Sequence, residues 1–220
     1  SIGFVVHLNY KNPSLSPFEE FQRYKTHPLI KDMLTGGKRL SYGARVISEG
    51  GYQSVPKLTF PGGLLVGCAA GFVNVPRIKG SHNAIVSGVL AANALLESFT
   101  SKKISEELVS YQDMYNKSTI AKELSKVRNV KPLWSKFGTL VGVALGGVDM
   151  WLRDLGINIP FTMSHKKPDH LTLQKKSASK KIEYPKPDGV YSFDRLSSVY
   201  LSSTNHEEDQ PVHLNIGDFG

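Results

Sequence analysis

The stretch PGGLLVGCAAGFVNVPRIKGSHNAIVSGVLAAN, Pro61 to Asn93, is the most informative part of this sequence. It begins with a short apolar run, continues through a glycine-rich turn and a loop, and ends in a segment of small residues with helical spacing. A strand, a turn and a helix in this order bring backbone N–H groups close to a bulky anionic ligand. The fold prediction therefore starts from this unit.

The turn and the start of the helix are the candidate binding residues. Small residues in the turn allow the backbone to approach a ligand closely. The first N–H groups of the helix have no partner inside it and carry a partial positive charge, which would stabilise the anion of a reduced flavin. The candidate cofactor-binding residues are Gly67, Cys68, Ala69, Ala70, Gly71, Gly80, Ser81, His82 and Asn83.

Two of these residues have side chains with chemistry of their own. A neutral imidazole is favoured for His82 in the first turn of a helix, where it either caps a backbone group or hydrogen-bonds a cofactor edge. Cys68 has apolar neighbours, which favours a small residue beside the cofactor over a nucleophile. The histidines and acids of the chain form no catalytic triad or metal-ligand spacing, so the sequence predicts neither catalytic side chains nor a metal site.

The composition is that of a globular protein with an excess of positive charge. The chain has 220 residues, a net charge of +8 and 40% hydrophobic residues. This charge favours an acidic partner, but no arginine-rich run or known motif supports binding of nucleic acid. A single cysteine excludes an internal disulfide. Both ends of the sequence resemble cuts within a longer protein.

Local patterns predict the elements around the glycine-rich unit. Strands are expected at residues 1–9, 38–47 and 64–66, the last buried on both faces. Helices are expected from Phe18 to about Thr26, over residues 81–98 and over residues 105–128. One stripe of the 81–98 helix holds only small residues: Ala84, Gly88, Ala91 and Ala92. Such a stripe predicts close packing against a strand or a cofactor.

The apolar segment from Phe137 to Val148 is too short to cross a bilayer. Trp151 and lysines on both sides are typical of a segment that lies in the membrane interface. A buried core helix is the alternative. Beyond Ser164 the chain is polar and basic, as expected for exposed loops with a short strand or helix within residues 190–201.

Several longer motifs resemble one known family, the electron transfer flavoprotein–ubiquinone oxidoreductases. The similarity extends over nearly the whole chain and is looser over residues 129–182. The motifs are GGKRLSYGAR (36–45), EGGYQSVPKLTFPGG (49–63), GFVNVPRIKGSH (71–82), NYKNPSLSPF (9–18), EYPKPDG (183–189) and TNHEEDQP (204–211).

The resemblance implies a function that the residues alone do not. It implies a redox flavoprotein that takes electrons from reduced electron transfer flavoprotein and passes them to ubiquinone, using FAD and a [4Fe–4S] cluster. It also implies attachment to the matrix side of the mitochondrial inner membrane, as a monotopic protein that contacts the membrane surface. The dinucleotide fingerprint of an FAD domain and the four cluster cysteines are not in this sequence, so the chain resembles the middle portion of such an enzyme.

The expected fold class is α/β with an α+β part: a fragment of a glutathione-reductase-like FAD domain interwoven with a quinone-binding domain. Residues 1–60 would belong to the quinone-binding domain and 61–112 to the FAD domain. Residues 113–175 would form a helical, membrane-contacting portion, and 176–220 an extended segment leading toward an iron–sulfur domain.

Two other functions remain open from the sequence. One is a related FAD-dependent reductase or hydroxylase, and the other is a non-catalytic membrane-associated assembly subunit.

Overall fold

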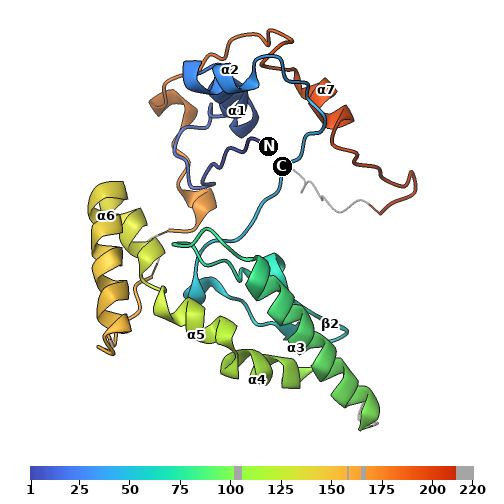
Figure 1. Cartoon of the computed structure of the whole chain (residues 1–220), viewed down its shortest axis with the longest axis vertical. Coiled ribbons are helices and arrows are strands. Elements are labelled where there is room, and N and C mark those ends of the chain that lie inside the picture. The colour runs from blue at the N-terminus through green and yellow to red at the C-terminus, as the bar shows by residue number, and fades with distance from the viewer. Residues whose placement is uncertain (102–105, 158, 165–166, 212–220) are drawn as a thin grey trace. The chain divides into compact units, whose positions relative to one another are not determined.

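A computed structural model describes residues 1–101, 106–157, 159–164 and 167–211. The chain divides into two compact units (Figure 1). The central unit is Val46–Lys166, and the N/C unit combines Ser1–Arg45 with Lys167–Gly220. Predictions that concern residues 102–105, His165, Lys166 or His213 lie outside the described residues.

The N/C unit joins the two ends of the sequence. Its helices are α1 (Pro17–Lys25), α2 (Pro28–Leu34) and α7 (Arg195–Tyr200), with 3₁₀ turns η3 (Asp169–Leu171) and η4 (Lys176–Ala178). The Tyr184 hydroxyl accepts a hydrogen bond from the Ser16 backbone N–H at 3.0 Å and donates to Glu20 at 2.9 Å. The Arg39 guanidinium donates to the hydroxyls of Ser197 and Ser198. These bonds connect segments more than 150 residues apart in sequence.

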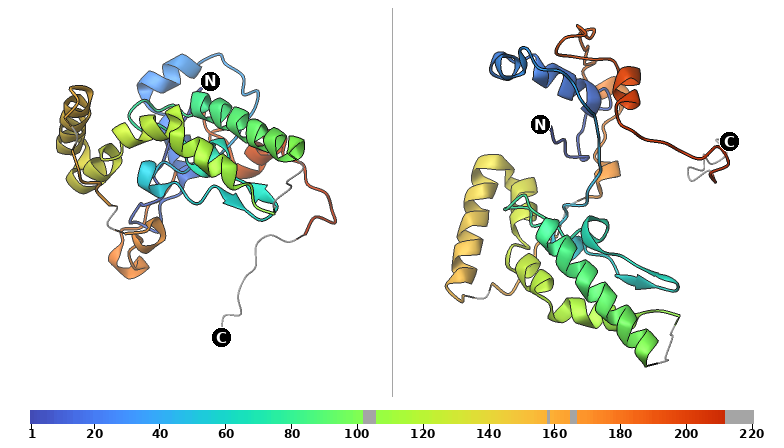
Figure 2. Two further views of the ribbon diagram at one scale, coloured as in Figure 1. Left: turned by 90° about the horizontal axis from the view of Figure 1, so that it is seen from below. Right: turned by 45° about the vertical axis from the view of Figure 1, so that its right-hand side comes forward.

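The central unit contains the glycine-rich segment and most of the helices (Figure 2). Its elements are η1 (Tyr52–Ser54), β1 (Thr59–Phe60), β2 (Gly63–Leu64), η2 (Gly67–Ala70), α3 (Ser81–Thr100), α4 (Val109–Lys117), α5 (Thr119–Lys126) and α6 (Val130–Asp154). β1 and β2 pair antiparallel, and this is the only sheet among the described residues. The described fold is therefore a mixture of helices and one small sheet.

One hydrophobic cluster holds α3, α4 and α5 against the glycine-rich segment. Phe72 stacks on Tyr115 with ring centroids 5.0 Å apart, and the Tyr111 hydroxyl donates to the Leu65 carbonyl at 3.0 Å. The cluster consists of Leu58, Ala70, Phe72, Ala91, Ala94, Tyr111, Tyr115, Ile120, Ala121 and Leu124.

The helix predictions are confirmed in large part. α1 begins at Pro17 after the Ser16 N-cap, whose hydroxyl accepts from Glu19 N–H, and it ends before Pro28. α3 covers the whole predicted helix of 81–98. The prediction of one helix over 105–128 is wrong, because Ser118 accepts from Ala121 N–H and caps a separate helix, α5. α7 provides the helix expected within 190–201.

The strand predictions for residues 1–9 and 38–47 are wrong: these residues form no paired strand, and Leu8 and Asn9 lie in a turn. In the first of these segments Phe4 packs on Tyr24, with ring centroids 5.3 Å apart. Apolar, β-branched residues favour a strand only where a neighbouring strand can pair with them. Residues 1–9 are therefore held by side-chain packing on α1 and not by hydrogen bonds to a neighbouring strand.

The prediction of a doubly buried strand at 64–66 is also wrong. Leu64 belongs to a two-residue antiparallel hairpin, and Val66 is 37% exposed. The turn through Gly62, at φ +78°, reverses the chain within four residues, whereas a parallel strand needs a long crossover connection.

Candidate functional site

The glycine-rich turn after β2 lies against the amino-terminal part of α3. Gly67 has φ +59°, and a Cβ there would come within 3.1 Å of the Ala84 Cβ on α3. Its N–H donates to the Ser87 hydroxyl at 2.9 Å. Gly71 has φ +77°, and a Cβ there would lie 3.3 Å from the Ser48 hydroxyl. Both positions therefore need glycine, for conformation and for space.

The turn presents its middle residues to solvent and keeps the others inside. Cys68 and Ala69 are exposed, whereas Gly67, Ala70 and Gly71 are buried. The Cys68 thiol is free. The exposed edge of the turn is therefore formed by two of the five turn residues that the sequence predicts to bind a cofactor.

α3 begins at Ser81 without a side-chain cap. Gly80 is its N-cap residue, and the first turn of the helix holds no acidic residue. The first backbone bond of the helix runs from Ala84 N–H to the Gly80 carbonyl, 2.8 Å. A Cβ at Gly80 would lie 3.3 Å from Val73 Cγ2, so the preceding loop packs tightly against the helix start. The first backbone N–H groups of α3 thus have no side-chain cap, and the positive end of the helix dipole favours a negative group beside them.

In the first turn of α3 one side chain packs against the preceding loop and two face solvent. Asn83 is 1% exposed, and its amide donates to the Phe72 carbonyl at 3.3 Å. Ser81 and His82 are exposed. Asn83 therefore fixes the loop to the helix, while Ser81 and His82 remain accessible.

His82 has an acidic partner that the sequence did not reveal. Its Nε2 lies 3.0 and 3.1 Å from the two carboxylate oxygens of Glu123 on α5. Glu123 also accepts from the Asn74 amide at 2.5 Å. Burial by itself would raise the pKa of Glu123, but the hydrogen bonds from Asn74 and His82 and the nearby positive charge lower it. Only packing of α5 on the loop brings Glu123 here, and no local motif encodes that contact.

Only part of the stripe of small residues on α3 packs against other parts of the protein. Ala91 is buried in the core, and Ala84 lies against Gly67 of the glycine-rich turn. Ala92 is exposed, and a Cβ at Gly88 would meet nothing within 4 Å among the described residues. The close packing predicted for Gly88 is thus not found within the described part of the chain. The exposed side of α3 is apolar instead, with Ile85 at 69% and Leu96 at 64% exposed.

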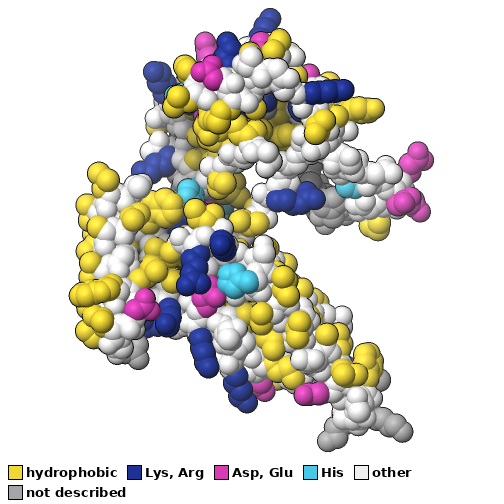
Figure 3. All heavy atoms as spheres, in the orientation of Figure 1, with side chains coloured by type: hydrophobic (Ala, Val, Ile, Leu, Met, Phe, Trp, Pro, Cys, Tyr) yellow, Lys and Arg dark blue, Asp and Glu magenta, His cyan; other side chains and the backbone are white. Residues whose placement is uncertain are grey.

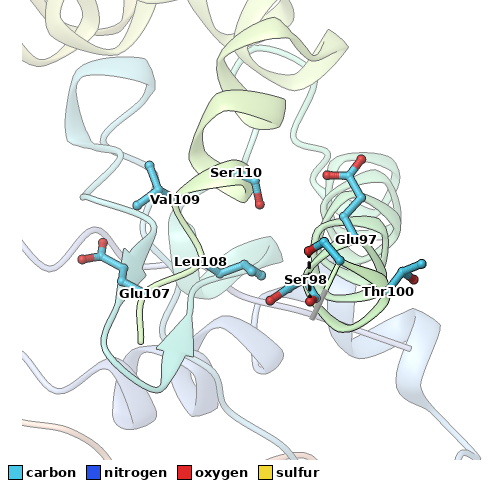
Figure 4. A pocket seen from close by; sticks show the side chains of 8 residues that line it. Glu97, Ser98, Thr100, Glu107, Leu108, Val109 and Ser110 are labelled. Carbon is cyan, nitrogen blue, oxygen red and sulfur yellow. Dashed lines mark hydrogen bonds between the residues drawn. The ribbon is translucent and has the colours of Figure 1, made fainter. Parts of the chain in front are cut away.

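A cavity of about 600 Å³ lies at the other end of α3 (Figure 4). It lies between the carboxyl end of this helix and the start of α4, with Leu108 pointing toward α3. The lining is formed by Glu97, Ser98, Thr100, Ser101, Glu107, Leu108, Val109 and Ser110. None of the predicted binding residues is among them.

α6 forms a second candidate surface because it folds back on itself. Gly138, at φ +76°, interrupts the helix, and residues 139–154 return alongside residues 130–137. A Cβ at Gly142 would lie 2.6 Å from the Leu133 carbonyl oxygen, and one at Gly146 would lie 3.3 Å from Val130. Glycine therefore permits the two arms to pack backbone to backbone.

The side of α6 that faces away from the short arm is apolar and exposed (Figure 3). Asp149 and Arg153 form a buried ion pair on the inner side, 3.0 Å apart. The exposed residues of the outer side, hereafter the α6 outer face, are Leu140, Val141, Val143, Leu145, Val148 and Trp151. Within the described residues this helix is thus not a buried core helix.

None of the described helices is long and apolar enough to cross a membrane. In the same residues no group of three or more histidine, cysteine and acidic side chains is placed to hold a metal ion.

Known families match both ends of the chain. Residues 1–47 match a family model described as ETF-QO, ubiquinone-binding. Residues 189–219 match one described as electron transfer flavoprotein-ubiquinone oxidoreductase, 4Fe-4S. Both matched segments belong mostly to the N/C unit.

Curated relatives match the whole chain. A protein of Pseudomonas aeruginosa named electron transfer flavoprotein-ubiquinone oxidoreductase is 50% identical over 218 residues, 99% of this chain and 39% of the relative. Mitochondrial proteins of the same name from Bos taurus and Homo sapiens are 51% and 49% identical over 99% of this chain and 36% of their own length. The chain thus spans less than two-fifths of the length of these relatives. Identity of about one half along its entire length places the chain in the electron transfer flavoprotein–ubiquinone oxidoreductase family of enzymes.

Proposed function

We propose that this chain is part of a redox flavoprotein that passes electrons from reduced electron transfer flavoprotein, through FAD, to ubiquinone. The observation that carries the proposal is the glycine turn of 67–71 beside the uncapped amino end of α3, in a chain about half identical to enzymes of that name. Residues 61–112 would then be a segment of an FAD domain. Residues 1–60 would belong to the quinone-binding domain, in agreement with the ubiquinone-binding model that matches residues 1–47.

The residues of the turn and of α3 fit an FAD in steric and electrostatic terms. Gly67 and Gly71 leave no room for side chains, and Cys68 and Ala69 offer a small exposed edge. Gly67–Gly71 would contact the ribityl–pyrophosphate part of FAD, and Gly80–Asn83 would lie beside its isoalloxazine ring. FAD supplies the electron-accepting and electron-donating chemistry when bound.

The protein residues in this proposal bind, orient and tune the cofactor. The open N–H groups of α3 would favour negative charge on the adjacent ring. Electron transfer between fixed cofactors needs no side-chain acid or base, so a catalytic residue is not required. Binding geometry and exclusion of water would be the contribution of these residues.

A [4Fe–4S] cluster does not fit the residues of this chain. Residues 189–219 match a 4Fe–4S family model, yet they contain no cysteine, and the single cysteine of the chain is Cys68. Such clusters are held by four cysteine thiolates. We therefore assign the cluster to the part of the relatives' length that this chain does not span, with residues 176–220 leading toward it.

We further propose that residues 113–175 contact the membrane through the α6 outer face. An apolar helical face with a tryptophan and with lysines at both ends of the segment is typical of interfacial helices. The proposed location is the matrix side of the mitochondrial inner membrane. The names of the bovine and human relatives include the word mitochondrial, which supports the mitochondrial part of this proposal, whereas the name of the bacterial relative specifies no compartment.

The decisive experiment uses the full-length protein that contains this chain. It should be yellow as purified, release FAD on denaturation, and reduce a soluble ubiquinone analogue when given reduced electron transfer flavoprotein. A colourless, FAD-free preparation would contradict the proposal and favour the assembly subunit. Aerobic oxidation of NAD(P)H would instead favour the related reductase or hydroxylase.

A further inference from the structure

Glu123 brings a negative charge to the amino end of α3 from a different helix. Its carboxylate contacts His82, which lies 41 residues earlier in the chain, and also the Asn74 amide. The Arg77 guanidinium lies 4.0 Å away. The side chain of Glu123 is only 22% exposed, so these contacts are partly shielded from solvent.

Asn74 organises the turn that precedes α3, hereafter the 74–79 turn. Its backbone N–H donates to the Lys79 carbonyl at 2.8 Å, and its side-chain oxygen accepts from Arg77 N–H at 3.2 Å. Asn74 is 1% exposed, so its amide has to be satisfied inside the protein. Glu123 provides that partner.

The 74–79 turn holds a conformation that its sequence does not favour. Ile78 has φ +50°, although a β-branched residue is rarely found in the left-handed region. Its side chain is 88% exposed and does not anchor the turn. A strained turn persists only where surrounding contacts fix it, and the Asn74–Glu123 bond is such a contact.

We propose that Glu123 is a positioning residue of the flavin site: it fixes the 74–79 turn through Asn74 and the first turn of α3 through His82. This inference rests on the proposed function, since it assumes that FAD binds beside these two segments. It goes beyond the proposed function because it states that one carboxylate, on α5, holds the 74–79 turn and the first turn of α3 in place relative to each other. The hydrogen bonds lower the pKa of Glu123, so the carboxylate is ionised at neutral pH and both bonds are charge-assisted.

The test compares Glu123→Ala and Glu123→Gln in the full-length protein. Trypsin can cut after Arg77 and Lys79, so the rate of cleavage there measures how firmly the turn is held, with or without FAD. Glu123→Ala should raise this rate about tenfold, because a local opening then no longer breaks a hydrogen bond to a charged group. Glu123→Gln keeps an acceptor oxygen for Asn74 and should restore most of the protection.

The same variants report on the flavin. Glu123→Ala should lower flavin content and change the visible circular dichroism of any flavin that remains. In Glu123→Gln, flavin content should stay near that of the native protein while the dichroism changes, since the charge beside His82 is lost. Lys122→Ala, at the exposed neighbouring position of α5, is the matched control and should change neither readout.

The outcomes separate this inference from the proposed function. Native protein that contains no FAD would contradict the proposed function before any variant is made. Native protein that contains FAD, with cleavage and dichroism unchanged in both Glu123 variants, would overturn the positioning role alone. If Glu123→Ala does not fold, unchanged dichroism in Glu123→Gln is enough to reject the role.

Discussion

At the scale of single residues, Gly80 lies in a tightly packed position beside the proposed flavin site. It stands between the 74–79 turn and α3, and a Cβ there would lie 3.3 Å from Val73 Cγ2 and 3.5 Å from the Phe72 carbonyl oxygen. Larger side chains would push the loop away from the helix start. The spacing of the N–H groups around the proposed ring position would then change.

We therefore expect Gly80→Val to lower the flavin content of the full-length protein at least severalfold, and Gly80→Ala to have a smaller effect. The measurement is the ratio of flavin to protein absorbance after purification. Gly43→Val is the control, because a Cβ at Gly43 would meet nothing within 4 Å. Full flavin content in Gly80→Val would show that this loop is placed wrongly in the proposal.

Lys25 is a buried cation in the N/C unit. Its Nζ lies 5.2 Å from the centre of the Phe21 ring and 5.0 Å from that of Phe193. Burial lowers the pKa of Lys25 to about 8, and the positive charge of Arg39 adds to the effect. In an unfolded chain the pKa of lysine is about 10.4.

Because the Lys25 amine loses its proton more easily in the folded protein, the free energy of unfolding should rise as the pH rises. Between about pH 8 and pH 10 the unfolded chain binds more protons at this residue than the folded chain, so the free energy of unfolding increases. Lys25→Met should remove this rise, as measured by urea unfolding across that range. Lys31→Met, at an exposed lysine over the Tyr191 ring, should keep it. If the free energy of unfolding of Lys25→Met rises with pH as steeply as that of the native protein, Lys25 is not the cause of the rise.

At the scale of elements, the two arms of α6 depend on glycine at their contact. Gly142 faces the short arm, where a Cβ would lie 2.6 Å from both the Leu133 carbonyl oxygen and Trp134 Cα. Gly147 lies on the same helix, and a Cβ there would meet nothing within 4 Å. The two glycines thus form a matched pair with opposite expectations.

Gly142→Ala should destabilise the protein by about 1–3 kcal/mol, because the arms would have to move apart. Gly147→Ala should stabilise it by up to about 1 kcal/mol, since alanine favours a helix over glycine. Thermal and denaturant unfolding of both variants measure the difference. Equal effects in the two variants would mean that the arms are not packed as described.

The α6 outer face should control binding to membranes. Replacing Val141 and Leu145, which are 54% and 41% exposed, with glutamate places two charges where we propose lipid contact. Each lost apolar contact contributes about 1.5–3 kcal/mol, so partitioning into liposomes should fall by tenfold or more. Val109→Glu is the control, at a residue 56% exposed at the start of α4. Unchanged partitioning of the double variant would remove α6 from the proposed membrane surface.

At the scale of the whole molecule, the charge of +8 adds a long-range attraction to an anionic lipid surface. Raising the salt concentration from about 0.05 M to about 0.5 M shortens the screening length severalfold. Binding to vesicles that contain anionic lipid should therefore weaken with salt but should not vanish, because the apolar contact of α6 persists. Complete release at high salt would indicate a purely electrostatic attachment.

The sequence by itself determined the features that local interactions encode. The Ser16 N-cap with Pro17 meets a hydrogen-bonding requirement within three residues, and the positive φ angles of Gly67 and Gly71 meet a local conformational one. Long motifs also identified the family, which the comparisons support independently. The assignment of residues 67–71 and 80–83 to FAD stays a prediction.

Only the tertiary structure decided the features that depend on distant partners. The segments at residues 1–9 and 38–47 have strand-like composition, but no strand pairs with them among the described residues. The contact of Glu123 with His82 needs α5 to pack on the loop before α3, and the backbone contact at Gly142 needs α6 to fold back at Gly138. Contacts of this kind arise from burial and from the path of the chain, which local sequence patterns do not contain.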